Sequence, residues 1–104
     1  MQVELERCQL RPGEVVRGRV QLDAEGARTE LSVLWETQGK GTTDLGVIHH
    51  RELGAGEHPF EVALPRLPLT YVGTLIKVRW LVRLRRIATI GDDQVVDAEF
   101  EVAW

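Results

Sequence analysis

A glycine-rich run, Gly39-Lys40-Gly41-Thr42, is the first feature of this sequence that could do chemistry. Backbone N–H groups exposed by glycine, together with a lysine, can hold a phosphate or another anion. A nucleotide-binding P-loop also needs an earlier glycine, a serine or threonine directly after the lysine, and a following helix. Leu34 and Gly41 occupy those two positions and a strand pattern follows. The run therefore predicts a loop tip whose Lys40 and Thr42 contact a partner, with anion or carbohydrate binding as the alternative.

Three histidines and one cysteine are the other reactive candidates. His49 and His50 are adjacent, and neighbouring strand residues point to opposite faces, so the two cannot bind one metal ion together. His58 could join one of them, but no cysteine or carboxylate cluster with ligand spacing supports a zinc site. Cys8 lies in an apolar-flanked strand and is expected to be a small core residue. We therefore predict no catalytic residue, no metal and no cofactor.

Basic residues alternate with apolar ones in a long strand pattern: Lys77, Arg79, Arg83 and Arg85. If the flanking strands form a hairpin around residues 90–93, Arg85 falls near Asp97 and Arg83 near Glu99. Opposite charges across strands contribute about 0.2–1 kcal/mol per pair. We expect this stripe to fix strand register and keep the chain in solution, with docking of an acidic partner as the alternative.

Apolar residues on the predicted outer faces give another candidate surface: Val15, Leu34, Leu75 and Leu81. Several such side chains on neighbouring strands would form a patch of the kind that marks an interface. The edges of a sheet also offer unpaired backbone groups to another chain. Both features predict contact with a protein, and Leu34, Arg79, Leu81 and Arg83 join Lys40 and Thr42 as candidate binding residues.

Length and composition limit the possible functions. The 104 residues suit one domain, residues 1–104. Thirteen basic and 16 acidic residues give a net charge of −3, which argues against binding to nucleic acid through a basic surface. No apolar segment approaches the ~20 residues of a membrane span. A lone cysteine and no signal-peptide pattern predict a cytoplasmic protein.

Period-two alternation dominates the chain and predicts an all-β fold. The expected strands cover about residues 3–10, 15–22, 30–36, 43–53, 58–64, 76–85 and 96–104, and the first bends near Glu6 or Arg7 to cross between sheets. Seven short antiparallel strands separated by turns predict an immunoglobulin-like β-sandwich. Its core is expected to include the aromatic residues Trp35, Phe60, Trp80, Phe100 and Trp104.

Several turns and strands together resemble the arrestin-like family. Pro12-Gly13-Glu14 precedes a strand with Gly18. His58-Pro59-Phe60 leads to Leu64-Pro65, and Leu67-Pro68-Leu69-Thr70-Tyr71-Val72-Gly73 is similar to the family's Pro-Ser-Tyr-x-Gly segment. The alternating strand from Val78 to Arg85 follows. The similarity covers nearly the whole chain and consists of turns and alternation.

The resemblance implies a non-enzymatic adaptor or scaffold. Arrestin-like proteins, including the Vps26 group and a bacterial sporulation-control group, usually carry two sandwiches, whereas this chain has length for one. A homodimer would restore the paired arrangement. The paired basic residues that animal arrestins use on phosphorylated receptors have no counterpart in Val3-Glu4-Leu5-Glu6, so the resemblance transfers no receptor-binding residue.

Overall fold

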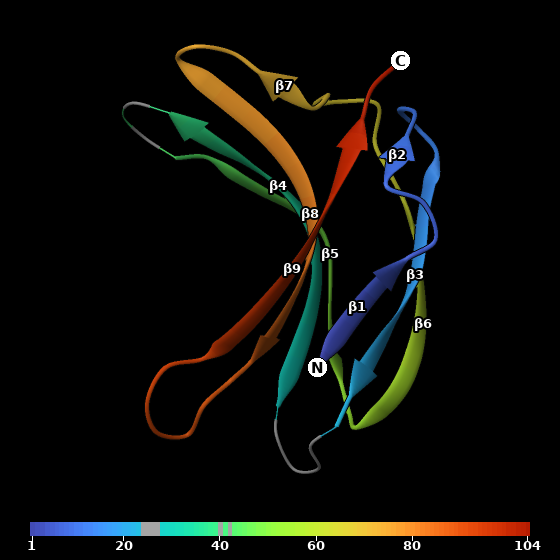
Figure 1. Cartoon of the computed structure of the whole chain (residues 1–104), viewed down its shortest axis with the longest axis vertical. Helices are drawn as coiled ribbons and strands as arrows, with labels where there is room; N and C mark the ends of the chain where they lie inside the picture. The colour runs from blue at the N-terminus through green and yellow to red at the C-terminus, as the bar shows by residue number, and fades with distance from the viewer. Residues whose placement is uncertain (24–27, 40, 42) are drawn as a thin grey trace.

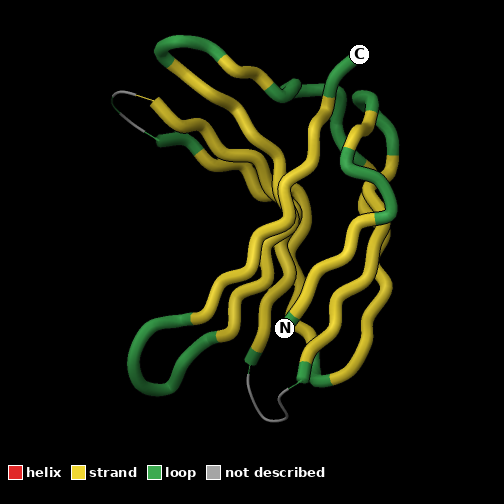
Figure 2. The backbone as a smooth tube through the Cα atoms, in the orientation of Figure 1, coloured by secondary structure: helices red, strands yellow, loops and turns green. Residues whose placement is uncertain are grey.

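The regular structure of this chain is built from strands. The computed structural model describes residues 1–23, 28–39, 41 and 43–104, and Figure 2 shows strands and loops throughout them. The strands are β1 (Gln2–Leu5), β2 (Gln9–Leu10), β3 (Val15–Leu22), β4 (Thr29–Gly39), β5 (Leu45–Leu53), β6 (Gly56–Ala63), β7 (Tyr71–Val72), β8 (Ile76–Arg86) and β9 (Gln94–Val102). Within these residues there is no helix long and apolar enough to cross a membrane.

The strands form two sheets that pack face to face, which confirms the predicted sandwich (Figure 1). A small sheet has the order β1-β3-β6. A large sheet has the order β2-β9-β8-β4-β5, with β7 beside β8. The pairs are antiparallel except β2 with β9, which is parallel. In Figure 1 the large sheet twists strongly, so that its strands cross at mid-length and spread at both ends.

The predicted first strand is two strands that belong to different sheets. β1 pairs with β3 in the small sheet, and β2 pairs with β9 in the large one. The bend between them lies at residues 6–8, close to the predicted position. β7 was not predicted, because two residues are too short for alternation to be visible. It lies beside Lys77 and Val78 of β8, beyond the point where β9 leaves that strand.

The core is apolar and lies between the two sheets. Its buried members are Leu10, Val16, Val20, Leu22, Leu31, Val33, Leu53, Phe60, Val62, Leu64, Trp80, Val82, Leu84, Phe100 and Val102. The rings of Trp80 and Phe100 lie 5.9 Å apart, and Trp80 Nε1–H donates to the carbonyl oxygen of Pro68 at 2.9 Å. Trp104, which was expected in the core, is 76% exposed. It follows the last strand residue, where alternation no longer fixes its face.

Gly18 leaves room within the small sheet for the buried ring of Phe60. These two residues are directly opposite across β3 and β6. A methyl group at position 18 would lie 2.8 Å from Phe60 Cζ and would also collide with the backbone oxygen of Glu4. The glycine therefore matters for close packing rather than for backbone freedom.

Replacing a Cα hydrogen of Gly18 by a methyl group tests the close packing against Phe60. Gly18→Ala should lower the free energy of unfolding by about 1–3 kcal/mol, as overpacked cores do, which corresponds to about 4–8 °C in Tm per kcal/mol. Gly54→Ala is the matched control, because a methyl group there meets no atom within 4 Å. Equal thermal stability of the two variants by circular dichroism would contradict this account.

The turn before β3 is closed by the side chain of Glu14. Its Oε1 accepts the backbone N–H of Arg11 at 2.6 Å, and its Oε2 lies 3.3 Å from the Arg7 guanidinium. Gly13 supplies the positive φ of 82° that the turn requires. The Arg11 N–H, and then Arg7, lower the pKa of the Glu14 carboxyl below its ordinary value of 4.5.

This lowered pKa predicts how stability depends on pH. Because the folded state favours the carboxylate, the contribution is present above the unfolded pKa of 4.5 and is lost as the pH falls through the folded pKa. The difference in unfolding free energy between the native chain and Glu14→Gln should be constant near neutral pH and shrink in acid. Urea titrations at several pH values measure it. A difference that grows on acidification would refute the assignment.

Candidate functional site

The histidines and the cysteine do not converge on one site. His50 lies on the outer face, where its Nε2 is 2.6 Å from Glu30 Oε2, and His49 is opposite the core residue Val33. His58 Nε2 is 2.8 Å from the carbonyl oxygen of Gly54. Across the described ranges no group of three or more His, Cys, Asp or Glu side chains could hold a metal ion. Cys8 is exposed at the bend between β1 and β2, so its predicted place in the core was wrong.

The predicted partner-binding residues fall into three groups. Lys40 and Thr42 lie outside the described residues. Leu34 and Leu81 are on the outer face of the large sheet, as predicted, but are only 2% and 0% exposed. The expectation that they offer an apolar surface was therefore wrong. Arg79 and Arg83 flank these leucines on the same face.

The two arginines cover the leucines. Leu34 and Leu81 are directly opposite each other, with Glu36 opposite Arg79 on one side. Arg79 binds Glu36 and also lies 3.7 Å from Glu99. Arg83 binds Asp97 at 2.9 Å and extends diagonally to within 3.8 Å of Glu36.

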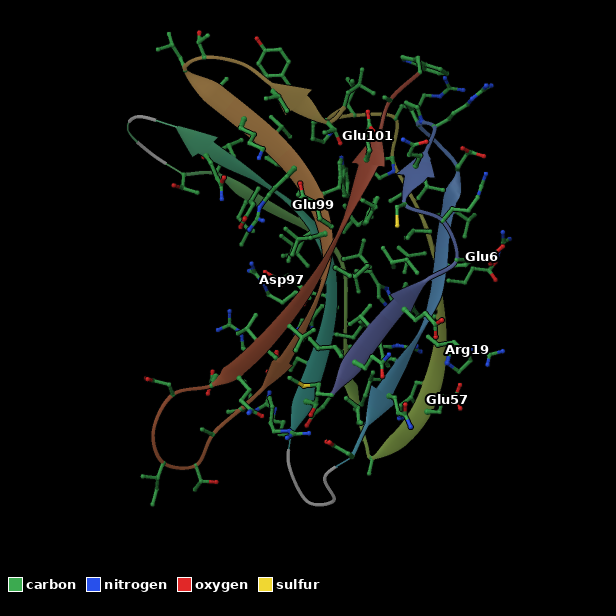
Figure 3. The ribbon with its side chains drawn as sticks, in the orientation of Figure 1. Glu6, Arg19, Glu57, Asp97, Glu99 and Glu101 are labelled. Carbon is green, nitrogen blue, oxygen red and sulfur yellow. The ribbon has the colours of Figure 1, made fainter. Side chains whose placement is uncertain are left out.

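The Arg83 guanidinium thus spans the leucine pair between Asp97 and Glu36, and Arg79 reaches Glu99 beside Leu81, so the leucines stay buried. Long basic side chains can cover apolar surface in this way. The hydrogen bond with Asp97, together with the charges of Asp97 and Glu36, raises the pKa of Arg83. Figure 3 shows Asp97 and Glu99 next to one another along β9. We name this cluster of Glu36, Arg79, Arg83, Asp97 and Glu99 the charged cover.

The cross-strand pairs differ by two residues from the expected register. Arg83 is opposite Asp97 rather than Glu99, and Arg85 is opposite Val95. The physical reason is the length of the connection, because residues 87–93 all lie between β8 and β9. Three of the four members of the stripe nevertheless form ion pairs, since Arg79, Arg83 and Arg85 each lie within 4 Å of a carboxylate.

The outer face of the small sheet is also charge-balanced. Arg17 lies 3.3 Å from Glu61, and Arg19 lies 3.2 Å from Glu57. Arg17, Arg19 and Glu61 line part of an open hollow of about 720 Å³. Figure 3 shows Arg19 and Glu57 on the side of the molecule opposite to Asp97. Because each arginine already has a carboxylate partner, this face offers no excess positive charge to an anion.

Exposed apolar side chains gather at one end of the large sheet. We name this the distal end: the first half of β5, β7, the β7–β8 turn and the start of β8. Its exposed members are Leu45, Val47, Tyr71, Val72, Leu75 and Ile76, between 46% and 74% exposed. In Figure 1 the end of β4 and the start of β5 lie on the same side of the molecule as the β7–β8 turn, and Gly39 of β4 is paired with Ile76 of β8.

Sequence reasoning found only Leu75 of this group. In a regular strand Leu45 and Val47 would face inward, in line with His49. The irregular pairing of β5 with β4 at residues 33–34 places both side chains on the outer face instead. Tyr71, Val72 and Ile76 flank a turn that carries few polar residues. That unusual composition was the available signal.

The charged cover predicts that neutralising Glu36 destabilises the fold more than neutralising Glu57. Glu36 is 13% exposed and contacts both arginines, so Glu36→Gln should lower the unfolding free energy by about 1–3 kcal/mol. Glu57→Gln breaks an exposed pair and should cost at most about 1 kcal/mol. Chemical denaturation measures both losses, and equal losses would show that the charged cover contributes no more than an exposed ion pair.

Comparison with known proteins identifies the fold. A scan against family models finds no match, and no curated protein sequence matches significantly. The crystal structure of Spo0M, a sporulation control protein from Bacillus subtilis, superposes with a TM-score of 0.62 at 23% identity, over 97% of this chain. The chain spans 47% of the length of Spo0M, about half. The predicted resemblance is thereby confirmed at the level of structure: this chain has an arrestin-like fold.

Proposed function

We propose that residues 1–104 form a single arrestin-like sandwich that acts as a non-enzymatic adaptor or scaffold and binds a protein through its distal end. The observation that carries the proposal is the gathering of Leu45, Val47, Tyr71, Val72, Leu75 and Ile76, each at least 46% exposed. Several exposed apolar side chains at one end of a sheet are costly in water and are typical of an interface.

The state of the ionisable groups supports a binding role over a catalytic one. In the described part of the chain, the carboxylates nearest to bases are held in ion pairs on the sheet faces, such as Glu36 with Arg79 and Asp97 with Arg83. A general acid or base needs to be free to exchange a proton with substrate. Spo0M is described as a sporulation control protein, which is a regulatory description. We place the chain in the cytoplasm, where the unpaired Cys8 would stay reduced.

Capture of binding proteins from an extract of the native host, by the native chain and by a variant, tests this function. The double variant Val72→Ser with Leu75→Ser removes two apolar side chains from the distal end. Each is expected to contribute about 1 kcal/mol or more on burial, so a bound protein should be recovered at least about tenfold less.

The control is Ile90→Ser, because Ile90 is 93% exposed in the β8–β9 connection, away from the distal end. Quantitative mass spectrometry compares proteins bound to the native chain and to both variants. Proteins lost with the double variant and kept with Ile90→Ser would support the proposal. Identical binding to all three forms would reject it.

A further inference from the structure

The first half of β5 is an open strand edge. In the described chain β5 pairs with β4 and forms the end of the large sheet. The neighbouring edge, β6 of the small sheet, is blocked. Pro59 has no N–H to offer, and its carbonyl oxygen already accepts a hydrogen bond from Arg51 Nη2 at 2.9 Å. Residues Leu45–Ile48 of β5 carry neither proline nor charge, so the usual protection of an edge is missing there.

The hydrogen bonds of Asp44 show which backbone groups of β5 are free. Thr37 N–H donates to the Asp44 carbonyl oxygen at 2.9 Å, and Asp44 N–H donates to Thr37 Oγ1 at 2.8 Å. The backbone of Asp44 thus points toward β4. Because successive residues of an antiparallel strand alternate between its two sides, the N–H and C=O groups of Leu45 and Val47 point away from β4, toward the open edge.

From these groups we infer that a second copy of this chain pairs antiparallel with β5, about a two-fold axis at Gly46. Leu45 then lies opposite Val47 of the partner subunit, and the two exchange both backbone hydrogen bonds. The symmetry repeats the exchange between Val47 and Leu45 of the partner subunit. The inference rests on the proposed function, since it names the partner of one part of the distal end.

Side-chain chemistry favours this register. Leu45 and Val47 are on the outer face and are 55% and 50% exposed, so pairing about Gly46 brings apolar groups onto apolar groups. Gly46 presents no side chain at the axis, and its inner side is filled by the Trp35 ring.

Other registers are less favourable. An axis at Arg51 would place that arginine against Arg51 of the partner subunit, and like charges directly opposite are destabilising. The irregular pairing after Val47 also ends the regular edge at Ile48. A two-fold pairing uses the same surface on both copies. The short edge of Leu45–Val47 allows this, because it pairs with the same three residues of the second copy.

The test is the mass of the native chain in solution, by light scattering and sedimentation, from roughly 1 µM to 1 mM, the range suited to a small interface. Mass should rise from 11.8 kDa toward twice that value. Val47→Pro removes an edge N–H, and Leu45→Lys adds a charge to the same edge. Each should weaken association at least about tenfold.

The matched control is Ile90→Lys, which places the same charge in the exposed β8–β9 connection, outside both the β5 edge and the distal end. It should associate as the native chain does. Hydrogen exchange adds a direct readout, because the amides of Leu45 and Val47 should become protected as concentration rises. Thermal melts establish that each variant is folded, and Leu45→Lys serves alone if Val47→Pro is not.

A native chain that stays monomeric at all concentrations would overturn the inference. So would undiminished association of Leu45→Lys, or loss of association in Ile90→Lys alone. These outcomes are separable from failure of the proposed function, because capture that depends on Val72 and Leu75 does not require Leu45 or Val47 to pair.

Discussion

The whole architecture depends on the buried contact between Trp80 and Phe100. Pairing of β8 with β9 ends at these two residues. Beyond them β9 joins β2, and β7 takes its place beside β8. The large sheet therefore divides at this point, and a wide, fully buried indole fills the space. Its N–H also fixes the crossing segment at Pro68, so one side chain holds the divided sheet and the chain that passes over it.

The outer face of the large sheet shows why charge and apolar character must be considered together. The leucines of β4 and β8 would form an exposed stripe if their neighbours were short. Arg83 instead extends across them toward Glu36, and Arg79 reaches Glu99 beside Leu81. The result is a face whose apolar groups are hidden and whose charges are mutually satisfied. The proposed interaction lies at the end of the sheet, where the described apolar side chains remain exposed.

Much of the fold could be predicted from alternation and turns. The two-sheet arrangement, the bend after β1 and the inward residues of β3 and β6 follow from period two and from Pro12-Gly13-Glu14. Features that depend on three-dimensional contact were missed. The Arg83–Asp97 register depends on the length of the β8–β9 connection, and the burial of Leu34 depends on side chains from another strand. Trp104 lies beyond the last paired residue, so the alternation of the strand does not determine which way its side chain faces.

Arg51 and Pro59 carry a consequence for aggregation. A sandwich in which two edge strands could each pair with a strand of another copy could add copy after copy and grow into a fibril. Here the β6 edge of the small sheet is blocked by Pro59, which has no N–H, and by the guanidinium group of Arg51, which binds the Pro59 carbonyl oxygen. Polymerisation by addition of a strand along that edge is thereby blocked.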